Sequence, residues 1–239
     1  MAKFKAIFGS ENPVVEDSDY WLTVSDLMAG LMMVFLFIAI VYMRDISLER
    51  DKIKDVAVAY QQNQVAIYDA LNSEFSHELV SWKASVDKET LSFQFNSPEV
   101  LFDSGDSNLK SEFEEILITF IPRYLSVLEK FKDSIDEVRI EGHTSSEWGN
   151  DTPPDAAYFL NMALSQNRTR SVLNFAYQDT GLSKNEQNWV KKTFSAVGLA
   201  SAKAKLNIDG SENKELSRRV SFRVITNADI QIRKIIEGI

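Results

Sequence analysis

The strongest constraint on the fold is an apolar run of 21 residues, from Leu22 to Tyr42, in which Asp26 is the only formally charged side chain. As an α-helix this run rises about 30 Å, enough to cross the hydrocarbon core of a bilayer. A signal peptide fits less well, because acidic residues precede the run and no small-residue cleavage site follows it. We therefore expect a short tail over residues 1–20 and a single-pass transmembrane helix over residues 21–43.

Asp26 lies where a carboxylate is expensive, since an acid at mid-membrane costs about 2.5–3.5 kcal/mol on insertion scales. One interpretation places it near the interface, where it helps to cap the helix together with Ser25. The other gives it a function, because Asp26 shares a helical face with Ala29 and Gly30, which are small enough for a second helix to approach closely. A carboxyl group in such a contact can take up and release a proton.

Composition excludes several classes of function. The chain holds 26 Lys and Arg against 35 Asp and Glu, a net charge of −9, which argues against nucleic acid as the main partner. It has no cysteine, so disulfides, thiolate metal sites and cysteine nucleophiles are excluded, and its two histidines argue against a histidine metal site. No nucleophile–base motif or phosphate loop stands out, so we expect neither an enzyme nor a bound cofactor or metal.

Residues 44–87 follow as a predicted helical connector. No glycine or proline interrupts residues 44–82, and apolar side chains recur there at helical intervals. Two interpretations stay open: a solvated amphipathic linker, or a seam that pairs two copies of the chain. The apolar spacing is not a strict heptad, which limits the support for the seam.

The remaining residues, 88–239, read as one α/β domain. Alternating apolar residues predict strands, and longer apolar periods predict helices. The expected strands are residues 91–95, 138–144, 191–200 and 216–227, and the expected helices are residues 109–131, 158–181 and a short one over 228–239. Pro122 is expected to kink or split the first of these helices. Alternating strands and helices predict a two-layer sandwich with the helices on one face of the sheet.

Three motifs carry a family resemblance. The segments EGHTSS, NMALSQNRTRSVLNF and RRVSFRV resemble the OmpA-like peptidoglycan-binding domain, and the resemblance covers residues 88 to 227. In that family a groove holds the diaminopimelate of the peptidoglycan stem peptide. The resemblance implies wall-binding roles for a set of groove residues, namely Arg168, Asn161, Leu164, Ser145 and His143. The planar fork of Arg168 suits a carboxylate, although a surface salt bridge is the alternative for this residue.

The sequence departs from the family pattern at one position. The family has an acid directly after Gly-His-Thr to meet the ammonium group of the ligand, and here that position is Ser145. The loop that follows is also longer than usual. Its acids, Glu147, Asp151 and Asp155, are the candidates to replace the missing carboxylate.

A membrane helix that opens with Ser-Asp-Leu-Met, followed by a helical connector and an OmpA-like domain, resembles the MotB family of stator subunits. The acidic N-terminal segment, EDSDYWLTVSDLMAGLMMVFLF, is similar to the Zorya anti-phage branch of that family. The resemblance implies that Asp26 carries the translocated ion, a proton rather than sodium. It also implies a homodimer inside a ring of ZorA-type membrane subunits. The protein is then expected in the bacterial inner membrane, bound to peptidoglycan, with a cytoplasmic N-terminus and a periplasmic domain. A count of flanking basic residues alone favours the opposite orientation.

Three functions follow as hypotheses. The first is a stator-like subunit of an ion-driven motor in anti-phage defence. The second is a flagellar stator subunit. The third is a passive peptidoglycan anchor without ion transport, which would tolerate the loss of the Asp26 carboxylate.

Overall fold

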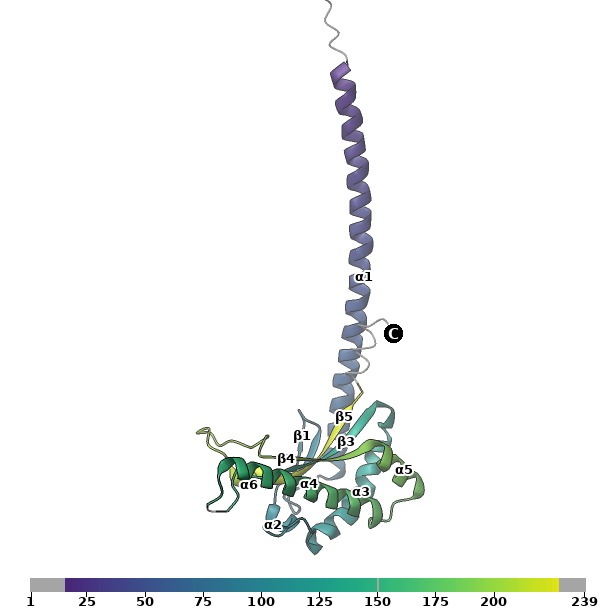
Figure 1. Cartoon of the computed structure of the whole chain (residues 1–239). Helices are drawn as coiled ribbons and strands as arrows, with labels where there is room; N and C mark the ends of the chain where they lie inside the picture. Colours follow the sequence, from purple (N-terminus) through teal and green to yellow (C-terminus); the bar gives the residue numbers. More distant parts are fainter. Residues whose placement is uncertain (1–15, 150, 228–239) are drawn as a thin grey trace, which may run out of the picture. The chain divides into compact units, whose positions relative to one another are not determined.

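The computed structural model describes residues 16–149 and 151–227 (Figure 1). It divides into two units, with the boundary between Lys54 and Asp55. The helix expected over residues 228–239 lies outside the described residues.

The first unit is the N-terminal part of α1, a helix that runs without interruption from Glu16 to Glu74. Its most apolar 18-residue window has a mean hydropathy of 2.4, and none of that window is buried. Large apolar side chains from Tyr20 to Met43 are exposed all around the helix. By length and composition α1 can therefore cross a membrane, as the sequence predicts.

The second unit contains a five-stranded sheet in the order β1-β2-β5-β3-β4. Its strands are β1 (Ala84–Asp87), β2 (Ser92–Phe95), β3 (Ile135–His143), β4 (Phe194–Ala200) and β5 (Arg219–Thr226). Strands β3 and β4 are parallel, and the other neighbours are antiparallel. The helices are α2 (Pro98–Leu101), α3 (Ser111–Glu129), α4 (Pro154–Gln178), α5 (Lys184–Thr193) and α6 (Lys214–Ser217), with a 3₁₀ turn at Lys132–Ser134.

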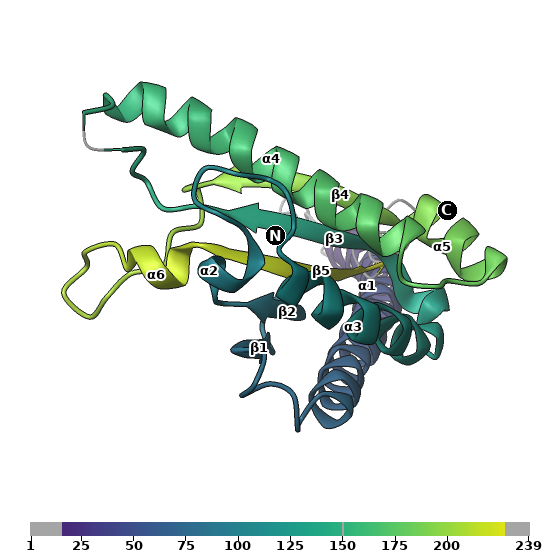
Figure 2. The same ribbon diagram turned by 90° about the horizontal axis from the view of Figure 1, so that it is seen from below.

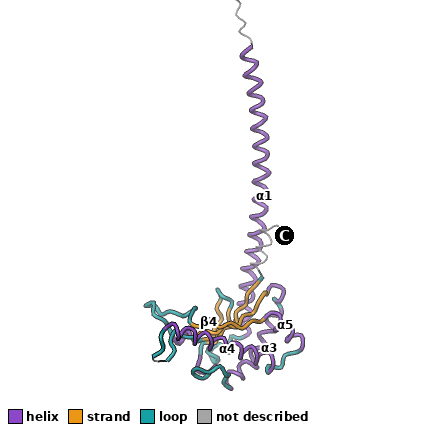
Figure 3. The backbone as a smooth tube through the Cα atoms, viewed as in Figure 1, coloured by secondary structure: helices purple, strands orange, loops and turns teal. Residues whose placement is uncertain are grey.

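Helices α3 and α4 lie across the same face of the sheet (Figures 2 and 3). Alternate strand residues point toward them, among them Phe93, Val138 and Phe222, which are buried. The predicted fold class, a membrane-length helix plus an α/β two-layer sandwich, is confirmed.

Three local expectations need correction. The connector is not helical to residue 87, because the chain reverses after α1 and residues 84–87 pair with β2 as an edge strand. Of the two effects expected at Pro122, the split does not occur: α3 continues through it, with Ile121 and Tyr124 beside it fully buried, and the kink stays a prediction. Helix α5 was not predicted, although its capping box of Ser183 and Glu186 is a readable start signal.

The last turns of α1 belong to the core of the domain. Ile67 and Leu71 in these turns, and Phe75 directly after the helix, are completely buried. Arg123 of α3 holds this end of the helix, donating to the backbone oxygen of Glu74 at 2.6 Å and lying 4.8 Å from the ring centroid of Phe75. In these turns the apolar stripe therefore packs on the chain's own domain. The interpretation that it pairs two copies of the chain is wrong for this part of the helix.

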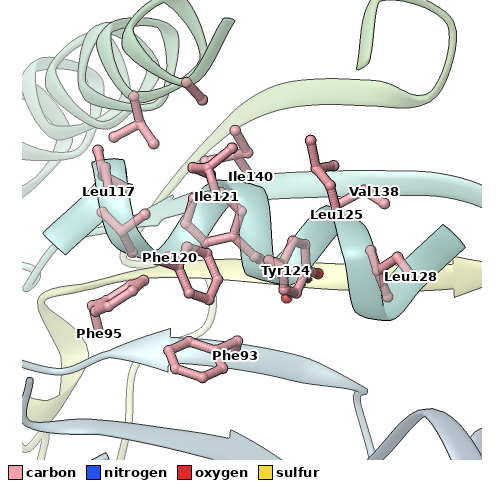
Figure 4. Packing of buried hydrophobic residues seen from close by; sticks show 14 of the residues in the cluster. Phe93, Phe95, Leu117, Phe120, Ile121, Tyr124, Leu125, Leu128, Val138 and Ile140 are labelled. Atoms are coloured by element: carbon pink, nitrogen blue, oxygen red, sulfur yellow. Dashed lines mark hydrogen bonds between the residues drawn. The ribbon is translucent and has the colours of Figure 1, made fainter. Parts of the chain in front are cut away.

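Phe120 lies at the centre of the aromatic core (Figure 4). Its ring centroid is 4.7 Å from that of Phe93 and 5.1 Å from that of Phe222, so one side chain joins α3 to two strands. It is also 5.2 Å from Phe75, which joins the same cluster to α1. Tilted and edge-on ring pairs of this kind add to the stabilisation from buried area.

Helix α4 lies unusually close to the sheet. A Cβ atom added at Gly198 of β4 would lie 2.4 Å from the backbone nitrogen of Gln166, and one at Gly142 of β3 would lie 2.7 Å from the carbonyl oxygen of Ser165. The Gln166 side chain uses this approach to pair with the edge strand, accepting from Gly198 N at 2.8 Å and donating to the Ala196 carbonyl at 3.1 Å. Two glycines thus set the position of α4.

We expect Phe120→Ala to lower the free energy of unfolding by about 3–5 kcal/mol, because it removes the ring that joins three elements. The matched control is Ile118→Ala on the same helix, where the side chain is 48% exposed. That change should cost less than about 1 kcal/mol in the same denaturant titration. Equal losses for the two variants would contradict the central role of Phe120.

Candidate functional site

A groove of about 460 Å³ lies on the second unit. Four segments form its walls: the chain between α2 and α3, the loop between β3 and α4, the groove-facing side of α4, and the C-terminal end of α6 at Arg218. The lining residues are Phe102, Asp103, Ser104, Gly105, Lys110, Thr144, Ser145, Glu147, Trp148, Gly149, Asn161, Leu164, Arg168 and Arg218. A volume of this size suits a small-molecule or peptide ligand.

Arg168 connects two of these walls. Its Nε donates to the carbonyl oxygen of Asp106 at 2.8 Å, and its Nη2 donates to that of Asp103 at 2.9 Å. The guanidinium group also lies 4.7 Å from the ring centroid of Phe102. Asn161 and Leu164 precede Arg168 by seven and four residues on α4, so all three reach the groove from one helical face.

The groove carries a positive charge at Arg168 and Arg218. Burial lowers the pKa of Arg168 to about 10, an effect that Asp106 opposes and Arg218 reinforces. The Arg168 guanidinium group is therefore charged at neutral pH. Arg218 donates through its Nε to the carbonyl of Lys214 at 3.1 Å. Both guanidinium groups donate hydrogen bonds to backbone oxygens, which leave their positive charge uncompensated. Two such neighbouring groups suit the binding of a carboxylate.

The loop between β3 and α4 brings Ser145 and Glu147 to the groove. Asn161 Nδ2 donates to the carbonyl oxygen of Glu147 at 3.0 Å, and the Glu147 carboxylate forms an ion pair with Lys214. Of the loop acids suggested by the sequence, Glu147 lines the groove. Asp151 and Asp155 are not among its described lining residues.

Sequence reasoning missed a second acid, Asp103. It lines the groove, and its Oδ1 lies 3.1 Å from Lys110 Nζ. The side chain of Asp103 is 73% exposed, so the carboxylate remains accessible. The signal was the turn-rich sequence around Gly105, whose φ of 72° reverses the chain.

His143 lies behind the groove, in a small cavity that it shares with Arg168 and Arg218. The imidazole is buried, with Nε2 3.3 Å from Ser221 Oγ and 3.5 Å from Glu141 Oε2. Burial lowers the pKa of His143; the Glu141 hydrogen bond opposes this shift, and the charges of Arg219 and Lys205 add to it. His143 thus supports the wall of the groove in its neutral form.

Asp26 lies in α1, in the first unit, with its side chain exposed. A Cβ atom added at Gly30 on the same face would meet no atom of the chain within 4 Å. The face with Asp26, Ala29 and Gly30 is therefore open to an approaching helix. In the described part of the chain no group of three metal-ligating side chains is present.

Comparisons with known proteins place the chain beside one relative over nearly its whole length. It is 52% identical over 232 residues to the Zorya protein ZorB of Escherichia coli strain Crooks, a match that covers 97% of this chain and 98% of the relative. No family model matches.

Similar solved structures include a putative MotB-like protein from Desulfovibrio vulgaris, with 20% identity and a TM-score of 0.48 over 74% of this chain and 94% of that one. The periplasmic domain of Helicobacter pylori MotB has 16% identity and a TM-score of 0.41 over 62% of this chain and 84% of that one. The family assignment rests on the sequence relative and not on these structures, which are similar to the chain only in part.

We expect the stability of the domain to fall as the pH is lowered from about 7.5 to about 5.5, because the fold favours neutral His143. The unfolded chain takes up a proton near the ordinary pKa of 6.5, whereas the folded chain does so only at lower pH. Stability is therefore complete above 6.5 and is lost as the pH falls toward the folded pKa. Glu141 affects stability only at lower pH, because its pKa in the folded chain lies below the ordinary value of 4.5.

Unfolding measured across this pH range tests the assignment. His143→Gln should flatten the pH dependence, and the control His77→Gln, at an exposed position, should retain it. An unchanged slope in His143→Gln would show that another group titrates.

Proposed function

Because the chain belongs to the ZorB family of Zorya proteins, we propose that it is the wall-anchored membrane subunit of an ion-driven motor in anti-phage defence. The observation that carries the proposal is Asp26, the only formally charged residue between Leu22 and Tyr42. An acid inside a membrane segment is presumed to have a function, because its insertion into the bilayer is otherwise only unfavourable in free energy.

In this proposal the Asp26 carboxylate takes up an ion on one side of the membrane and releases it on the other. A proton fits better than sodium, because a proton needs one carboxylate oxygen whereas sodium needs several oxygen ligands. Each charge moved across the potential supplies about 2.3 kcal/mol per 100 mV, enough to drive a conformational step.

The partners follow from the open face of α1. Ala29 and Gly30 beside Asp26 allow close contact with another membrane helix. We assign this contact to a ring of ZorA-type subunits around two copies of this chain. The N-terminus is then cytoplasmic, and the second unit lies in the periplasm, where it reaches peptidoglycan from the inner membrane.

The groove is assigned to the peptidoglycan stem peptide. Arg168 and Arg218 face a carboxylate of diaminopimelate, and Asn161 and Leu164 form the wall on α4. The ammonium group, which has no acid at Ser145, meets a carboxylate from another wall of the groove. Asp103 and Glu147 are the candidates, each paired with a lysine that the ligand ammonium would replace.

The proposal includes no catalytic step, and a passive anchor is its nearest competitor. The two differ in one respect, since a passive anchor needs the groove but not Asp26. A flagellar stator is less favoured because of the match to ZorB over 97% of the chain.

We expect Asp26→Asn to abolish phage protection by the intact operon, because the amide cannot carry a proton. The readout is phage plating efficiency at matched membrane levels of the protein. The matched control is Asp45→Asn, a change of the same chemistry on the same helix beyond the apolar run, which should retain protection. Full protection by Asp26→Asn would favour the passive anchor.

We expect Arg168→Ala to reduce cosedimentation with purified peptidoglycan sacculi at least about tenfold, since it removes a charge-assisted pair of about 1.5–3 kcal/mol. Arg218→Ala tests the second cation without removing the two Arg168 bonds to the turn after α2. The exposed Arg170 on the same helix provides the control Arg170→Ala. If all three variants sediment like the parent chain, the groove is not the wall site.

A further inference from the structure

Part of the apolar stripe on α1 is not covered by the described core of the domain. Ile67 and Leu71 on this stripe are completely buried. Two and three turns earlier on the same helical face lie Tyr60 and Val56, which are not among the described residues that pack on the core. Tyr60 is 37% exposed, and Val56 is half-buried. Because the apolar periodicity continues to Val56, the packing surface of α1 extends beyond the part that the described core covers.

Asn63 marks the point on this face where α1 meets the end of the sheet. Its Nδ2 donates to Ser134 Oγ at 2.9 Å. The carbonyl oxygen of the same serine accepts from the backbone nitrogen of Asn227 at 3.0 Å, and Asn227 Nδ2 donates to the Asp133 carbonyl at 2.8 Å. Asn227 directly follows β5 and is the last described residue. The chain after Asn227 therefore continues from a point close to Asn63, which is one helical turn from Tyr60.

The sequence after β5 has the pattern that such a surface needs. Residues 228–239 read ADIQIRKIIEGI, and a helix over them would place on one face the isoleucines at the helical spacing, namely Ile232, Ile235, Ile236 and Ile239. Their charged neighbours Arg233, Lys234 and Glu237 would fall on other faces. A helix of this length rises about 18 Å, whereas α1 rises only about 11 Å between Val56 and Asn63. The segment is therefore long enough to cover the exposed part of the stripe.

Two observations favour this segment over a second copy of α1 as the partner of the stripe. The segment is tethered at Asn227, next to the surface that it would cover, so its effective concentration there is high and independent of the protein concentration. The apolar spacing along the stripe also departs from the strict heptad that pairing of two identical helices favours. The chain's own segment is therefore the occupant that the geometry supports.

We propose that residues 228–239 form an amphipathic helix whose isoleucine face packs on Val56 and Tyr60 of α1. The contact continues the apolar surface that α1 already buries at Ile67 and Leu71. It holds these turns of α1 beside the end of β5, so the segment acts as a brace for the helix. The inference depends neither on the proposed wall binding nor on ion transport.

The test cross-links introduced cysteines in the full-length chain in detergent micelles, since the chain has no cysteine of its own. One stripe pair is Tyr60→Cys with Ile232→Cys, and the other is Val56→Cys with Ile236→Cys. The matched control is Gln62→Cys with Ile232→Cys. A short bismaleimide should give at least about fivefold more cross-link within one chain for the stripe pairs, because residues two apart on a helix do not share a face. Gel mobility and peptide mapping separate cross-links within a chain from those between chains.

A second measurement does not rely on cysteine. Ile235→Asp combined with Ile236→Asp should raise the rate of amide hydrogen exchange over residues 56–63 at least about tenfold, because these turns lose their apolar cover. The control Lys234→Asp changes the net charge by the same amount on a polar face of the proposed helix, and it should leave the exchange rate as in the parent chain. Thermal unfolding of each variant checks that the domain remains folded.

The outcomes are distinct for each occupant of the stripe. Cross-links within one chain at the stripe pairs, together with faster exchange in the isoleucine variant, support the brace. Cross-links between two chains would assign the stripe to a second copy and refute it. Equal yields from the stripe and control pairs, or an unchanged exchange rate in the isoleucine variant, would also refute it. None of these results bears on Asp26 or on the groove, which phage plating and sacculus binding test separately.

Discussion

The close approach of α4 to the sheet is the contact on which the groove depends. It exists because Gly142 and Gly198 leave no side chain between the strands and the helix backbone. Gln166 then hydrogen bonds to the edge strand and sets the rotation of the helix. That rotation turns the face with Asn161 and Arg168 toward the groove. A side chain at either glycine would push the helix outward and separate the groove walls.

The two faces of the sheet differ in polarity. The face toward the helices is apolar and is joined through the Phe120 cluster, which also includes the end of α1. The other face is polar, with Glu141 and His143 buried on alternate positions of β3. His143 reaches the cavity behind Arg168, so the polar face supports the groove from the rear. Core packing and support of the groove thus depend on different side chains of the same strand.

Local patterns predicted much of this architecture. Apolar periodicity gave the membrane-length helix, and alternation located β2, β3 and β5 within a few residues. The expectations that failed are those in which packing competes with local preference. The end of α1 reads as a solvated helix until Phe75 meets the rings of α3 and β2. The edge strand β1 exists because its backbone pairs with β2 and not because of its own residues.

The sequence by itself determined where an acid enters the membrane segment and which residues of α4 share a face, because both depend on spacing along one helix. Only the tertiary structure decided which acids reach the groove. Asp103 lines it together with Glu147, whereas Asp151 and Asp155 are not among its described lining residues. The reason is that this loop is placed by contacts such as Ser146 to Glu212, between residues 66 positions apart. No local pattern encodes a contact of that range.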